Sequence, residues 1–190
     1  MLLPFLKPDI IEAGCDEAGR GCLCGPVACA AVILPPDFEC PDLDDSKKLS
    51  EKNREQLRPI IEQNALAWAV VMVPPEKIDE INILNASILG MQLALDKLSL
   101  RPQHILVDGN RFKPYKDIPY TAVVKGDGKY MSIAAASVLA KTHRDELLNR
   151  LAEEYPGYGL KENKGYPTKA HREAISSLGP PPIHRKTFKF

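Results

Sequence analysis

The chain has 190 residues, and its 25 basic and 25 acidic side chains give a formal net charge of zero. This length suits one domain with a buried core, and the 44% hydrophobic and 26% charged content is ordinary for a soluble globular protein. Zero net charge argues against binding through a general excess of positive charge. No apolar run reaches 18 residues, so we expect no membrane span, and prolines and charges in the first nine residues argue against a signal peptide.

All five cysteines lie within the first 40 residues. An odd, clustered set is a poor disulfide framework, and no further Cys/His pair stands at zinc-finger spacing. We therefore expect reduced thiols in a cytoplasmic protein, and a monomer is the expected state.

The first half of the chain predicts three strands and one helix. The strands cover 10–16, 26–34 and 65–73, and the first two are joined by a glycine-rich turn. Ser50 is typical of an N-cap and predicts a helix from Glu51 to about Gln63.

The second half predicts strands alternating with helices. Apolar residues at helical spacing predict a helix from Ile78 to Leu98, followed by strands at 104–107 and 120–124. A long helix from Met131 to about Tyr155 begins with several alanines, which permit close packing against a sheet. A short helix over Lys169–Leu178 precedes a proline-rich tail.

These elements predict one α/β domain over residues 1–190. The short first connection favours antiparallel pairing of the early strands, whereas the later strand–helix alternation favours parallel strands. We expect a mixed sheet of about five strands with helices on its faces.

Three aspartates stand at the ends of three predicted strands. Asp16 ends the first strand, Asp108 ends the fourth, and Asp127 follows the fifth. Sites in open α/β sheets form at the carboxyl ends of strands, so neighbouring strands would bring these acids together. Such acids repel each other unless a cation lies among them, and carboxylate oxygens favour Mg²⁺ or Mn²⁺ over zinc.

Glu17 directly follows Asp16, and neighbours in a regular strand point to opposite faces. Both can serve one site only if the chain bends there or if the Glu17 carbonyl is the ligand; otherwise Glu17 is a solvent-facing acid. Gly19 and Gly21 allow a bend and close approach of a ligand to the backbone, and Arg20 has a forked donor suited to phosphate. A tight turn with an exposed arginine is the plainer interpretation of these three residues.

Basic residues dominate the chain from Lys161 onward, with only two acids among them. Such a region is typical of a nucleic-acid surface, although an ordinary solvated face explains the charge equally well.

Six ordered motifs together resemble the bacterial ribonuclease HII family. They are DEAGRG at 16–21, DSKKLS at 45–50, VDGN at 107–110, KGD at 125–127, IAAASVLAKTHRD at 133–145 and KGYPT at 164–168. The resemblance runs from about residue 10 to the C-terminus. The arginine within GRG fits ribonuclease HII, since the sister type HIII usually has lysine there.

The resemblance implies an RNase H-like fold and endonucleolytic cleavage of RNA in RNA–DNA hybrids, with incision 5′ of single ribonucleotides in duplex DNA. It implies four active-site acids, Asp16, Glu17, Asp108 and Asp127. It further implies that the turn of Gly19, Arg20 and Gly21 reads the 2′-hydroxyl, that Tyr166 packs on the ribonucleotide sugar, and that phosphates contact Lys47, Lys48 and Lys141.

The chemistry agrees with these residues. Two divalent ions, Mn²⁺ or Mg²⁺, can activate a water and stabilise the leaving 3′-oxygen, and four carboxylates offset most of their charge. His143 and His171 are further candidates for proton transfer, provided that they reach the reacting groups.

Two other functions remain open from the sequence. One is a different RNase H-like nuclease, such as a resolvase, with the same metal chemistry and another substrate. The other is a non-catalytic nucleic-acid-binding protein, for which clustered acids are unfavourable because they repel phosphate.

Overall fold

The computed structural model describes residues 2–189. It confirms the predicted α/β class, and its elements are β1 (Glu12–Ala18), β2 (Val27–Ile33), α1 (Glu51–Asn64), β3 (Ala67–Val73), α2 (Pro75–Ile81), α3 (Ile83–Asp96), β4 (His104–Asp108), β5 (Tyr120–Val123), the 3₁₀ helix η1 (Gly126–Gly128), α4 (Met131–Glu154), α5 (Leu160–Asn163) and α6 (Lys169–Leu178).

The five strands form one mixed sheet in the order β3-β2-β1-β4-β5. β1 pairs with β2 and β2 with β3 in antiparallel register, whereas β4 is parallel to both β1 and β5. The expected split between early antiparallel and later parallel strands is confirmed. Because β1, β4 and β5 are parallel neighbours, their carboxyl ends meet at one edge of the sheet.

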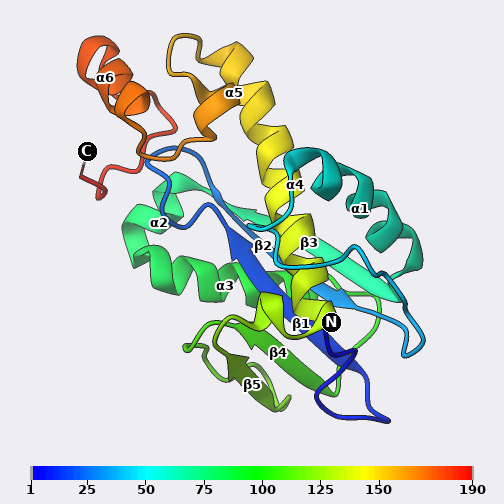
Figure 1. Cartoon of the computed structure of the whole chain (residues 1–190). Coiled ribbons are helices and arrows are strands. Elements are labelled where there is room, and N and C mark those ends of the chain that lie inside the picture. The colour runs from blue at the N-terminus through cyan, green and yellow to red at the C-terminus, as the bar shows by residue number, and fades with distance from the viewer. Residues whose placement is uncertain (1, 190) are drawn as a thin grey trace.

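Helices cover both faces of the sheet (Figure 1). The long helix α4 crosses one face over β1 and β2 with α1 beside it, and α3 packs on the other face against β2 and β3. Alternate side chains of β1 pack into the two cores on opposite faces of the sheet. Ala13 and Cys15 belong to the core on the α3 side, and Ala18 belongs to the core under α1 and α4.

The close approach of α4 to the sheet depends on small residues. The alanines at 134–136 are fully buried at the start of the helix. A Cβ on Gly14 of β1 would lie 2.2 Å from the backbone carbonyl carbon of Ser132, so only glycine fits beneath α4 at this point.

The predicted helix over Ile78–Leu98 is wrong in one respect, because the chain forms two helices there. Asn82 has φ 65°, which ends α2, and its side chain accepts a hydrogen bond from the amide of Asn85 to begin α3. The sequence prediction also omitted η1 and α5, which are single turns too short to show a period.

A small separate core joins the C-terminal segments to the β1–β2 turn. It contains Leu23, Cys24, Leu148, Leu160 and Ile175. In Figure 1, α5 and α6 lie beyond the end of the sheet at which this turn is found. Within residues 2–189, no helix has both the length and the apolar character needed to cross a bilayer.

Candidate active site

Three aspartates meet at the carboxyl edge of the sheet. One carboxylate oxygen from each of Asp16, Asp108 and Asp127 lies within 4.8 Å of those of the other two. Asp16 and Asp127 are buried, and Asp108 is partly exposed. These side chains come from β1, from the end of β4 and from η1, so the parallel strand order creates the cluster.

Backbone amides fix the orientation of two of these acids. Asp108 Oδ1 accepts hydrogen bonds from the amides of Gly126 at 2.7 Å and Asp127 at 3.4 Å. Asp16 Oδ1 accepts from the amide of Glu17 at 2.7 Å. The turn through η1 therefore presents Asp127 and supports Asp108 at the same time.

Burial and mutual repulsion disfavour the charged forms of these acids. Burial, followed by the charges of Glu17 and Asp108, raises the pKa of Asp16 well above its ordinary value. Burial, followed by the charge of Asp127, also raises the pKa of Asp108. A cluster of this kind is stabilised by a cation between the carboxylates.

Glu17 is not a member of this three-aspartate group. β1 stays regular through Ala18, with Glu17 opposite Cys29 of β2, so the bend considered for this position is absent. Side chains alternate along a strand, so the Glu17 side chain points to the same face as those of Ala13 and Cys15, the α3 side. There it lines a small pocket with Asp108, Arg20 and Ser87. Arg20 Nη1 lies 3.4 Å from Glu17 Oε1. Glu17 thus lies beside Asp108 but outside the three-aspartate group, and its share in the metal site stays a prediction.

A lysine ammonium lies against the aspartate cluster. Lys47 Nζ donates to Asp127 Oδ2 at 3.0 Å, although the Lys47 side chain is 77% exposed. Burial lowers the pKa of Lys47, but the hydrogen bond and charge of Asp127 outweigh it and raise the pKa overall. Lys48 instead pairs with Asp44 at the surface. Only the first of these two lysines therefore touches the cluster.

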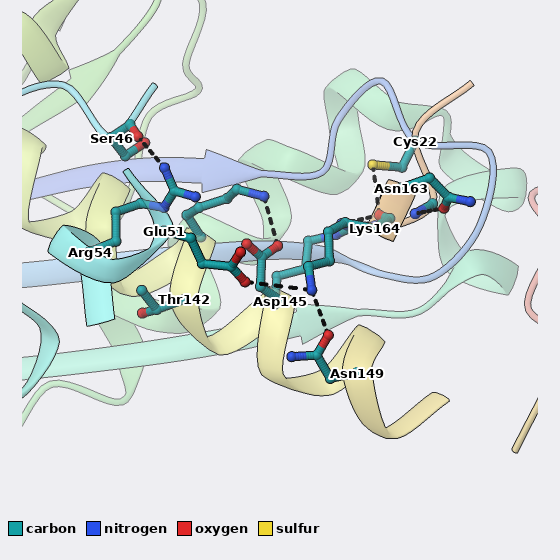
Figure 2. A network of polar contacts seen from close by, with 12 residues as sticks. Cys22, Ser46, Glu51, Arg54, Thr142, Asp145, Asn149, Asn163 and Lys164 are labelled. Carbon is teal, nitrogen blue, oxygen red and sulfur yellow. Dashed lines mark hydrogen bonds and ion pairs between the residues drawn. The ribbon is translucent and has the colours of Figure 1, made fainter. Parts of the chain in front are cut away.

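Lys141 of α4 and Tyr166 of the loop between α5 and α6 lie together. Lys141 Nζ is 5.6 Å from the centre of the Tyr166 ring and donates to Asp145 Oδ1 at 2.7 Å. Figure 2 shows Asp145 within a polar network between α1, α4 and the loop that precedes Tyr166. In this network Lys164 Nζ contacts Asn149 at 2.5 Å and Glu51 at 3.7 Å.

The G-R-G segment that follows β1 contains two glycines with different requirements. Gly19 has φ +87°, and a Cβ there would lie 2.0 Å from Nε of the buried Arg144. Gly21 has no positive φ, and a Cβ there would meet no atom within 4 Å. The fold therefore demands glycine at position 19, but it leaves the space beside Gly21 open.

Comparison with known proteins identifies the family. The family model described as Ribonuclease HII matches residues 13–190. The chain belongs to the ribonuclease HII family. Proteins named Ribonuclease HII from Parabacteroides distasonis and Bacteroides thetaiotaomicron are 65% and 66% identical to it, each over 99% of this chain and 94% of the relative. The crystal structure of ribonuclease H2 from Pyrococcus horikoshii superposes with a TM-score of 0.78 at 30% identity, covering 94% of this chain and 93% of that one.

Membership of the ribonuclease HII family makes the chain a metal-dependent hydrolase of nucleic acid, and the aspartate cluster fits this chemistry. Its donors are hard carboxylate oxygens, which suit Mg²⁺ and Mn²⁺. The Lys47 ammonium beside Asp127 also shows that the cluster accepts a positive charge.

The sequence analysis of this ribonuclease HII chain did not identify two arginines that are candidate functional residues. Arg144 and Arg185 are fully buried beneath the G-R-G turn, where their guanidinium groups contact backbone carbonyls. Arg144 stands within a motif quoted above, and Arg185 within the basic tail, but nothing in either pattern indicates burial. The tail is therefore not one solvated or nucleic-acid-binding face, since Lys164 and Arg185 are buried while Lys161, Lys169 and Arg172 are exposed.

The two histidines have other partners than the aspartates. His143 contacts Glu62 at 2.8 Å and Arg58 at 3.3 Å in the seam between α1 and α4. His171 is fully buried, and its Nδ1 lies 2.9 Å from the carbonyl of Tyr166. These contacts suit a structural role for each ring better than proton transfer.

Proposed function

We propose that the protein is an endoribonuclease that hydrolyses the RNA strand of RNA–DNA hybrids and incises 5′ of single ribonucleotides in duplex DNA. The observation that carries this proposal is the cluster of Asp16, Asp108 and Asp127 at the strand ends, in a chain of the ribonuclease HII family. It acts as a single catalytic domain and as a cytoplasmic monomer. The described cysteines are free and mostly buried, which supports a reducing compartment.

The residues divide into a catalytic and a recognition group. Asp16, Asp108, Asp127 and Glu17 would hold two divalent ions, Mg²⁺ or Mn²⁺, with Glu17 placed beside Asp108, with which it lines one small pocket. Bound ions supply an activated water and stabilise the leaving 3′-oxygen. The carboxylates would offset the charge of the ions, and no protein nucleophile is required.

Recognition of RNA requires a probe of the 2′-hydroxyl, which both donates and accepts hydrogen bonds. The backbone amides of the turn of Gly19, Arg20 and Gly21 supply donors to it, and the open space beside Gly21 lets a sugar approach. Tyr166 is 37% exposed and packs on the ribonucleotide sugar. Lys47, Lys48 and Lys141 contact phosphates on either side.

The test of this function is cleavage of a duplex that carries one ribonucleotide, with Mg²⁺, Mn²⁺ or EDTA. We expect a single cut 5′ of the ribonucleotide with either metal and none with EDTA. Equal cleavage of an all-DNA duplex would instead support another RNase H-like nuclease. Binding without any metal-dependent cut would support a non-catalytic nucleic-acid-binding protein.

Replacing Tyr166 with alanine is expected to lower cleavage at a lone ribonucleotide by about tenfold, because one aromatic contact with the sugar is lost. A long RNA–DNA hybrid offers many registers and should be affected less. Metal affinity should not change, since Tyr166 lies beside Lys141 rather than in the aspartate cluster. The measurement is kcat/KM on both substrates.

The matched control is Tyr158→Ala, which removes a nearby tyrosine whose hydroxyl donates to the carbonyl of Gly179. This variant should affect both substrates equally. Equal losses on the two substrates for Tyr166→Ala would mean that Tyr166 only holds its own loop in place.

Alanine at Lys47, Lys48 or Lys141 is expected to weaken binding to any duplex and to lower the slope of log affinity against log salt by about one each. The position of the cut should not change, because phosphate contacts carry no information about the sugar. Binding is measured as a function of salt concentration, with Lys97→Ala on the α3 C-cap as the control. A shifted cut with an unchanged slope for Lys141→Ala would contradict the phosphate role.

A further inference from the structure

Two arginines are fully buried beneath the G-R-G turn. Arg144 comes from α4 and Arg185 from the C-terminal tail, and both have 0% exposure. No ion pair within residues 2–189 includes either guanidinium group, and their hydrogen bonds go to main-chain carbonyls. The Arg185 guanidinium also lies 5.1 Å from the centre of the Phe188 ring. Burial, with the nearby Arg144 charge, lowers the pKa of Arg185 to about 10, so it remains protonated at neutral pH.

Arg185 holds the carbonyls of the turn directly. Its Nη2 donates to the carbonyl of Gly19 at 2.7 Å, its Nη1 to that of Arg20 at 3.0 Å, and its Nε to that of Gly25 at 3.0 Å. The described chain has no cis peptide, so each carbonyl and the following amide point in opposite directions. With the carbonyls of Gly19 and Arg20 directed at Arg185, the amides of Arg20 and Gly21 face away from it, toward the open side of the turn.

Arg144 extends the same arrangement to the loop that carries Tyr166. Its three nitrogens donate to the carbonyls of Pro26 at 2.9 Å, Cys24 at 3.0 Å and Lys164 at 2.8 Å. Main-chain hydrogen bonds connect the same segments, from Leu23 to Gly165 at 2.8 Å and from Arg185 to Leu23 at 2.9 Å. The tail, the G-R-G turn and the Tyr166 loop thus share one set of contacts.

A purely structural role would not require charge at these positions. Apolar side chains of similar volume are often as stabilising as buried charged groups, because desolvation of a charge is costly. What an apolar side chain cannot do is hold several carbonyls in one orientation, as the planar fork of arginine does here. The two guanidinium groups therefore fix the conformation of the turn.

We propose that Arg185 is a positioning residue that sets the preference of the enzyme for a ribonucleotide, by orienting the amides of Arg20 and Gly21 toward the 2′-hydroxyl. This inference rests on the proposed function, in which the turn reads that hydroxyl. Arg185 acts through the turn and does not itself touch the substrate.

The experiment measures binding of two duplexes that differ only in one 2′-hydroxyl, in an Asp108→Asn background that prevents cleavage. Arg185→Met removes the fork and the charge, whereas Arg185→Lys keeps the charge and reaches fewer carbonyls. Ile175→Ala is the matched control, because Ile175 is 1% exposed in the small core beside the turn but makes none of the hydrogen bonds that Arg185 donates to the carbonyls of Gly19 and Arg20. All variants are compared well below their melting temperatures, with the folded fraction measured by circular dichroism.

We expect Arg185→Met to lower the preference for the ribonucleotide duplex by about tenfold, the value of one hydrogen bond. Affinity for the all-DNA duplex should change less, and the control should keep the full preference. The preference of Arg185→Lys should lie between those of Arg185→Met and the control. If the methionine variant does not fold, Arg185→Lys is the variant that tests the inference. Full preference in a folded Arg185→Met, or in Arg185→Lys where the methionine variant is unfolded, would overturn the inference. Absence of any preference in Asp108→Asn alone would instead contradict the proposed role of the turn.

Discussion

Replacing Asp108 with asparagine is expected to lower cleavage by about a thousandfold or more while the fold is kept. Bound metal ions supply several kcal/mol of transition-state stabilisation, and each 1.36 kcal/mol corresponds to a factor of ten. Asp108 is part of the three-aspartate cluster, and its other contacts are the amides of Gly126 and Asp127. An asparagine oxygen can accept from the same amides, so the turn through η1 should persist.

The same substitution is expected to leave the metal-free protein equally stable or more stable. The raised pKa values of Asp16 and Asp108 mean that the folded state disfavours their charged forms. Without metal, folding stability should therefore rise as the pH falls toward these raised values, because the folded state binds protons more readily than the unfolded chain. The neutral asparagine removes part of this cost at neutral pH.

Thermal unfolding with and without Mn²⁺ separates the two effects. At a metal concentration 100 times Kd, the unsubstituted protein should gain about 2.7 kcal/mol, and Asp108→Asn should gain much less. Asp117→Asn is the control, since this aspartate has an 82% exposed side chain and lies outside the cluster. An Asp108→Asn variant with full cleavage and full stabilisation by metal would show that the cluster is not the metal site.

Alanine at Gly21 is expected to lower cleavage by about 10- to 100-fold without loss of stability. A Cβ there meets no protein atom within 4 Å, so the fold tolerates it, but it projects into the space that the sugar approaches. Displacement of a substrate by about 1 Å can cost a factor of 100 in rate.

Gly19→Ala should give the opposite balance and serves as the contrast. It places a Cβ on the Arg144 side chain and forces alanine to adopt φ +87°, which together should cost on the order of 2–4 kcal/mol. Chemical denaturation gives the stability of both variants, and kcat/KM on the single-ribonucleotide duplex gives their activity. Wild-type cleavage by a stable Gly21→Ala would mean that the sugar does not approach the turn at this position.

Much of the fold follows from local patterns in the chain. Alternating and continuous apolar runs predicted all five strands, and Ser50 marked the start of α1 because an N-cap acts within its own turn. The three aspartates were predicted to meet because each stands at the end of a strand, and parallel order then brings those ends together. The break at Asn82 was missed because a single residue with positive φ leaves the apolar period on either side intact.

Other features depend on contacts between segments far apart in the chain. The sequence left open whether Glu17 joins Asp16, and the regular pairing of β1 with β2 turned its side chain to the opposite face. Burial of Arg185 is decided by the carbonyls of a turn 165 residues away, which no local pattern of charge can indicate. Residue types and strand ends thus determined which chemistry the chain can perform, whereas tertiary packing decided which charged groups face the substrate and which hold the backbone that reads it.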